Sequence, residues 1–112
     1  MTIKYYVLDG KTVRPEPDLV KWAEWFETAN RIVRKDRATV RAARKVIDSV
    51  DVATVFLGFD HQIGEGPPLL FETTILGGPL DKECDRCSTW EAAEKMHEKM
   101  PKRVLYAAFN AG

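Results

Sequence analysis

The sequence lacks a long hydrophobic run, an excess of charge of either sign and any familiar catalytic motif. No stretch reaches the roughly 18–20 uninterrupted apolar residues of a membrane span. Basic and acidic residues both number 17, so bulk charge does not predict a nucleic-acid-binding protein. There is no phosphate-binding glycine loop, dinucleotide fingerprint, serine elbow or helix-turn-helix. These absences favour a binding protein over an enzyme, and no cofactor is predicted.

Cysteine and histidine are scarce, with two residues of each. The first nine residues lack the order of a signal peptide, so a cytoplasmic location is expected, in which Cys84 and Cys87 are free thiols. Their spacing fits half of a zinc site, which would need His61 and His97 to complete it. A redox pair is a further alternative, because a helix starting after Cys87 would lower its pKa. Incidental cysteines are the interpretation we favour.

At 112 residues the chain is expected to form a single domain, 1–112, with its own core. Two β-prone runs, 52–59 and 69–76, flank a loop containing glycine and proline and predict a central antiparallel hairpin. Neither run alternates strictly, which indicates burial on both faces or a position in the sheet centre. A shorter run at 3–8 predicts an N-terminal strand of the same small sheet.

Two amphipathic helices, 18–29 and 89–100, are predicted to pack on this sheet, which gives an α+β fold. The first has an aromatic stripe at helical spacing, more typical of a core than of a cofactor site: Trp22, Trp25 and Phe26. The second follows a capping box in which Ser88 is the expected N-cap and Glu91 its partner. Pro101 is expected to close or kink this helix.

Residues 31–50 are ambiguous between strand and helix. The tetrapeptide Arg31-Ile32-Val33-Arg34 suits a strand, whereas the alanine and arginine content of 38–48 favours a helix there. The stretch 31–45 has seven basic residues against one acid, Asp36. From this basic segment we expect contacts with phosphates or an acidic protein surface, by Arg37, Arg41, Arg44 and Lys45. A solvated face balanced by the acidic part of the chain is the alternative.

The loop 60–68 is the other candidate site. Asp60 and His61 directly follow a predicted buried strand, and Glu65 lies between two glycines that permit close approach of a ligand. One alternative is a small-ligand site, for a nucleotide or a metal-dependent reaction, that would also use Glu72 and His97. The other is purely structural, with Asp60 capping the turn.

Four motifs together resemble a family of small uncharacterised proteins encoded by tailed phages and prophages. They are Trp-Ala-Glu-Trp-Phe-Glu-Thr at 22–28, Phe-Leu-Gly-Phe-Asp-His at 56–61, Gly-Pro-Pro-Leu-Leu-Phe-Glu-Thr at 66–73 and Ser-Thr-Trp-Glu-Ala at 88–92. Compared with that family, the stretch 37–48 looks like an insertion, and Cys87 replaces an aromatic residue, which argues against a metal site.

The resemblance implies a phage protein in the host-cell cytoplasm that modulates a host process, as an anti-CRISPR protein does. Its partner would be a host protein or a protein–nucleic acid complex, with direct nucleic-acid binding through 31–45 as one route. A homodimer formed through an exposed strand edge is a third alternative.

Overall fold

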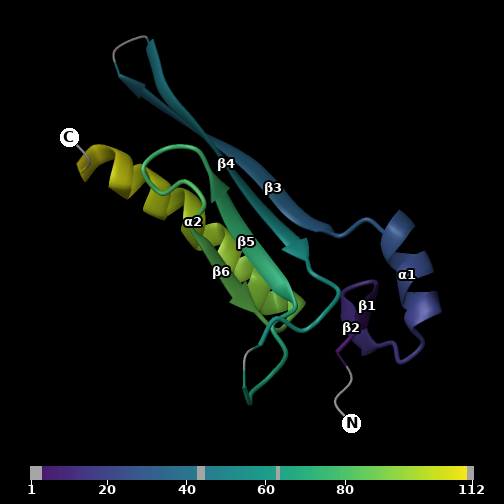
Figure 1. The fold of residues 1–112 in the computed structure, drawn as a ribbon. Helices are drawn as coiled ribbons and strands as arrows, with labels where there is room; N and C mark the ends of the chain where they lie inside the picture. Colours follow the sequence, from purple (N-terminus) through teal and green to yellow (C-terminus); the bar gives the residue numbers. More distant parts are fainter. Residues whose placement is uncertain (1–3, 43–44, 63, 111–112) are drawn as a thin grey trace.

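The computed structural model describes residues 4–42, 45–62 and 64–110, without the side chains of 40–48 and 105–110 (Figure 1). Within these ranges it has two helices and two antiparallel sheets, which confirms the α+β class. The elements are β1 (Tyr6–Asp9), β2 (Thr12–Pro15), α1 (Leu19–Thr28), β3 (Ile32–Ala42), β4 (Lys45–Phe56), β5 (Phe71–Leu76), β6 (Cys84–Cys87) and α2 (Trp90–Asn110).

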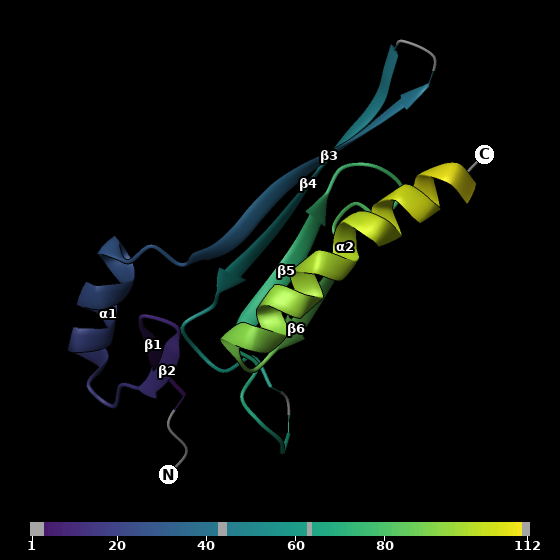
Figure 2. The same ribbon diagram turned by 180° about the vertical axis from the view of Figure 1, so that it is seen from behind.

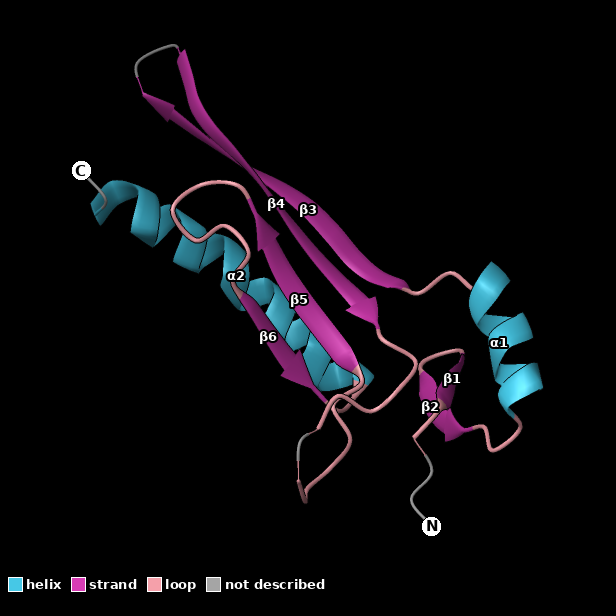
Figure 3. Cartoon of the chain, viewed as in Figure 1, coloured by secondary structure: helices cyan, strands magenta, loops and turns pink. Residues whose placement is uncertain are grey.

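The main sheet has the order β3-β4-β5-β6, with all neighbours antiparallel (Figure 3). The predicted central hairpin is confirmed, because β4 pairs with β5 from Asp51↔Leu76 to Phe56↔Phe71. Burial alternates along both strands, so that Val52, Thr54 and Phe56 are buried while Ala53 and Val55 between them are less so. Of the two alternatives, the position at the sheet centre is confirmed. Burial on both faces is wrong, because α2 covers only one face of these strands.

The core lies between α2 and this covered face of the sheet (Figure 2). One cluster joins Met100 and Val104 of α2 to Val50, Val52 and Ile75, and the other is built around Phe56, Leu70, Phe71 and Ala93. Apart from Ala93, full burial of each of these side chains stabilises the fold by about 1.5–3 kcal/mol.

Helix α2 differs from its predicted bounds at both ends. The Thr89 hydroxyl accepts a hydrogen bond from the Ala92 amide at 3.1 Å, so Thr89 is the N-cap and the prediction of Ser88 is wrong by one residue. Pro101 lies inside the helix, which continues to Asn110. Because Met100 and Val104 on either side of it are buried against the sheet, packing offsets the missing backbone hydrogen bond.

The N-terminal strand does not join the main sheet. It pairs instead with β2, because the Asp9-Gly10 turn, with Gly10 at φ 62°, reverses the chain at once. The indole Nε1 of Trp22 in α1 donates to the carbonyl oxygens of Tyr6, at 3.0 Å, and Gly58, at 2.9 Å. Trp22 thereby ties α1 and β1 to the segment after β4.

The helix favoured for 38–48 is wrong. Strands β3 and β4 pair from Ala38↔Val50 to Ala42↔Lys45 instead, and they pair beyond the last residue of β5. Intrinsic helix propensity differs by only tenths of a kcal/mol per residue, so pairing and burial of Ala38 and Val50 override it. We call residues 38–42 and 45–50 the arm.

The arm projects from one end of the sheet, and α1 with the β1–β2 hairpin lies at the other end (Figures 1 and 2). The molecule is accordingly long, with extents of 55 × 30 × 20 Å. At 3.3 Å per residue, the arm extends about 16 Å past the last β5 pair.

Candidate functional site

Asp60 closes the loop 60–68. Its Oδ1 accepts hydrogen bonds from the backbone amides of Gln62, at 2.7 Å, and Leu69, at 3.1 Å. The His61 ring stacks on Phe59, with centroids 4.3 Å apart, and its Nε2 is buried without a hydrogen-bond partner in the described part of the chain. Among the described residues, the two side chains therefore do not form an acid–base pair, and the geometry supports the structural alternative for Asp60.

Glu65 is exposed, and its contribution to the loop is its carbonyl oxygen, which accepts a hydrogen bond from Gln62 Nε2 at 2.9 Å. The loop follows the C-terminal end of β4, whereas Lys45 begins that strand, 12 residues long, at the arm. A strand of that length spans about 40 Å. The two predicted binding regions therefore do not form one site.

The residues of the small-ligand alternative do not converge. Glu72 lies on the sheet face away from α2, where it accepts from Arg86 Nε at 2.9 Å and from the Thr74 hydroxyl at 3.1 Å. His97 is on α2, against the other face. In the part of the chain that the structure describes, no group of three histidine, cysteine or acidic side chains is placed to hold a metal ion.

The two cysteines occupy the ends of β6 and point to opposite faces of the sheet. Cys84 is exposed, whereas Cys87 pairs with Phe71 and packs against the core. The prediction of a lowered pKa is wrong for Cys87, because burial raises the pKa of its thiol. Both are free thiols, as predicted.

A chain of hydrogen bonds runs through the core beneath α2. His97, which is fully buried, lies 2.6 Å through Nδ1 from the Thr54 hydroxyl and 2.8 Å through Nε2 from Asp36 Oδ2. The Thr54 hydroxyl is also 2.5 Å from that of Thr73. With a neutral imidazole protonated at Nε2, each group in the order Thr73, Thr54, His97 donates to the next, ending at Asp36.

The Asp36 carboxylate is the exposed end of this chain. The hydrogen bond from His97, followed by the positive charge of Arg34, holds its pKa below the ordinary value. A hydroxyl, an imidazole and a carboxylate in this order resemble a catalytic triad. However, Thr54 has no exposed surface, so a substrate does not reach it, and the network ties α2 to the sheet.

Sequence reasoning did not identify this network. Thr54 lies two residues from Val52 and two from Phe56, so all three side chains point to the same buried face of the strand. This spacing was the available signal for a buried hydroxyl. His97 was placed on the apolar side of its helix, but its partners depend on the register of three strands.

No helix of the described residues covers the sheet face opposite α2, and we call it the open face (Figure 1). Across its middle, Ala53 lies between Lys35 and Thr74, with Cys84 next to Thr74. On either side of that row are two ion pairs, Arg37–Asp51 at 2.8 Å and Arg86–Glu72 at 2.9 Å. The open face thus carries both signs of charge, with small side chains at its centre and the exposed Leu76 next to Asp51.

The predicted basic residues that the structure describes lie on β3 and β4, which form one two-stranded ribbon. Arg37 lies on the open face with its side chain 66% exposed, and Arg41 and Lys45 lie in the arm close to the turn. Arg44 falls outside the described residues. The Arg37 guanidinium lowers the pKa of Asp51, which raises that of Arg37 in turn.

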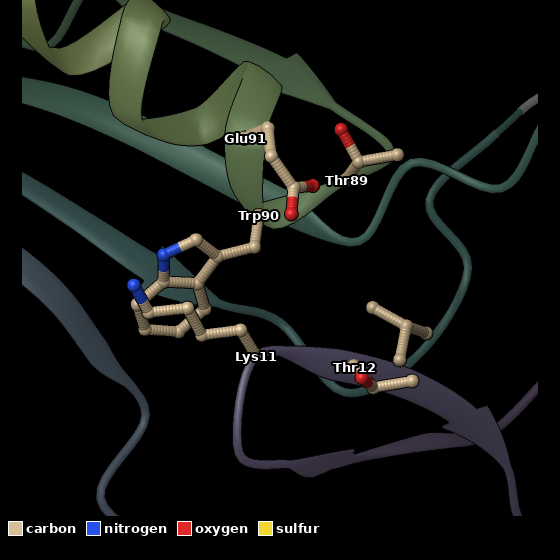
Figure 4. A pocket seen from close by; sticks show the side chains of 6 residues that line it. Lys11, Thr12, Thr89, Trp90 and Glu91 are labelled. Atoms are coloured by element: carbon tan, nitrogen blue, oxygen red, sulfur yellow. The ribbon is translucent and has the colours of Figure 1, made fainter.

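A cleft of about 330 Å³ lies between the β1–β2 turn and the start of α2 (Figure 4). Lys11 extends over the Trp90 ring, 5.8 Å from its centroid, and also lies 3.9 Å from Glu94. The Lys11 ammonium in the cleft is therefore paired within the chain, and we assign no ligand to the cleft.

No family model, curated protein or solved structure matches this chain. Among the described residues, neither helix combines the length and the apolar character needed to cross a membrane.

Proposed function

We propose that this chain is a phage-encoded binding protein that modulates a process in the host cytoplasm, without catalysis, by docking its arm and open face on a host macromolecule. The observation that carries the proposal is the arm, which extends past the last β5 pair and away from the core. The phage origin and the host process, including inhibition of a defence system, rest on the resemblance described above.

The base of the arm is fixed, which suits a recognition element. Ala38 and Val50, its first pair, pack against Met100 and Val104 of α2. Two residues earlier, Asp36 is joined to His97. Binding elements held on a rigid support lose less conformational entropy when they meet a partner.

The arm itself is expected to gain stability when it binds a partner. An isolated two-stranded ribbon is marginally stable in water, and a charged edge such as that of β3 discourages pairing with another sheet. Both features favour an element that meets a heterologous partner over one that forms a homodimer.

The test is capture from host lysate with a tagged protein. The double variant Arg41→Glu/Arg44→Glu should lose the captured partner, whereas Lys95→Glu/Lys99→Glu, with the same change in charge on α2, should retain it. If the protein captures nothing, or both variants behave alike, the proposal is wrong. In a host with active CRISPR immunity, defence inhibition predicts more plaques from a targeted phage when the protein is expressed.

A further inference from the structure

We infer that the partner is double-stranded DNA and that the arm enters its major groove, with the open face beside the groove. This inference rests on the proposed function and names its partner. It depends on the shape of the arm, the distribution of charge along the ribbon and the side chains that the open face lacks.

The shape of the arm fits a DNA groove. Its two strands lie about 4.8 Å apart, and the major groove of B-DNA is about 12 Å wide and 8.5 Å deep, enough for a two-stranded ribbon with its side chains. The arm extends about 16 Å beyond β5, further than the depth of the groove. Duplex RNA has a deep and narrow major groove, which a ribbon does not enter.

The charge along the ribbon is distributed for contact with phosphates. Residues 34–51 contain six basic side chains and three acidic ones. Asp36 and Asp51 are paired with basic groups near the base of the arm. The sequence from 38 to 50 contains one acidic residue, Asp48, and three basic residues, Arg41, Arg44 and Lys45. The positive charge of the ribbon is therefore greatest toward its turn.

The open face adds Lys35 to this charge and disfavours other partners. Arg37 and Arg86 also lie on it, but each is paired with a carboxylate of the same face, Asp51 and Glu72 respectively. None of its described strand residues is aromatic, so it lacks the stacking groups with which proteins hold single-stranded nucleic acid. It also lacks the buried aromatic anchors that dominate protein–protein interfaces.

The test is fluorescence anisotropy with a labelled 20-base-pair DNA of mixed sequence. We expect binding at 50 mM NaCl that weakens roughly 100-fold at 200 mM, as for release of counterions from three or four phosphates. The variant Arg41→Glu/Arg44→Glu/Lys45→Glu should lose at least roughly 100-fold in affinity. The control Lys95→Glu/Lys99→Glu/Lys102→Glu has the same net charge and should stay within about threefold of the parent.

Other outcomes would overturn the inference: no binding at 50 mM NaCl, equal loss in both variants, or equally tight binding of the single strand, duplex RNA or polyglutamate. Thermal unfolding followed by circular dichroism checks that the arm variant is folded. If DNA does not bind but lysate capture still depends on Arg41 and Arg44, the proposed function stands and this inference falls. If both fail, both are wrong.

Discussion

His97 Nε2 lies 2.8 Å from Asp36 Oδ2, and this contact joins the middle of α2 to the strand that continues into the arm. The other ring nitrogen contacts Thr54, so one side chain links α2 to two neighbouring strands. The buried imidazole therefore fixes the orientation of the arm relative to the helix together with the packing of Ala38 and Val50 against α2.

Replacing His97 with alanine should destabilise the fold by about 2–4 kcal/mol, since it leaves a cavity and a buried Thr54–Thr73 hydroxyl pair without its acceptor. Urea denaturation measures this change. Lys99→Ala, at an exposed position of the same helix, should cost less than about 0.5 kcal/mol. Equal effects of the two substitutions would show that the network does not stabilise the fold.

The Asp36 carboxylate should make stability depend on pH in the acid range. Its pKa in the folded state lies below the ordinary value of 3.8, so its contribution is present above that value and is lost as the pH falls through the folded-state pKa. Asp36→Asn should therefore be less stable than the parent at pH 7, and the difference should shrink below pH 3.8. A difference that stays constant from pH 7 to strongly acid conditions would contradict this account.

Gly58 should tolerate a side chain less well than Gly64. Both have positive φ, 84° and 89°, but a Cβ at Gly58 would lie 3.1 Å from the Phe26 ring, whereas one at Gly64 would meet no atom of the described residues within 4 Å. Gly64→Ala thus reports backbone strain alone, about 1 kcal/mol, and Gly58→Ala should cost at least about 1 kcal/mol more in thermal or urea unfolding. Similar costs would mean that Phe26 and Trp22 move aside freely.

The two thiols should differ in reactivity. Cys84 is exposed, and Cys87 is partly buried with a raised pKa, so less of it is thiolate at neutral pH. With a chromogenic disulfide reagent at pH 7.5, Cys87→Ser should leave a fast phase and Cys84→Ser one that is at least about tenfold slower. Equal rates would place Cys87 at the surface.

The sequence allowed the hairpin and both helices to be predicted because each had a local signal. Val52 to Phe59 and Leu69 to Leu76 flank a glycine- and proline-containing loop, and Asp18 caps α1 through bonds to the Val20 and Lys21 amides. The arm was missed because Val40, Ala43 and Ile47 suit a helical face as well as a strand. That ambiguity is resolved by pairing and burial of the arm base, which are tertiary effects.

The site was less predictable than the fold. Asp60 was predicted as a binding residue, and its hydrogen bonds to the amides of Gln62 and Leu69 agree with the alternative, in which it caps the turn. Glu72 and His97, the partners of the small-ligand alternative, lie elsewhere. The contact between Asp36 and His97 joins residues 61 positions apart. It depends on the register of β3 with β4, and no local pattern in the sequence fixes that register.

The central claim is that the arm recognises the partner while the rest of the chain folds without it. Thr39 and Ser49 are directly opposite each other, so Asn-Gly can replace residues 40–48 as a two-residue turn and remove the outer arm. The decisive measurement is partner binding by this shortened protein, with its thermal unfolding recorded alongside. The account predicts a melting temperature within a few degrees of the parent and at least a roughly 100-fold loss of binding; a folded, shortened protein that binds as tightly as the parent would contradict it.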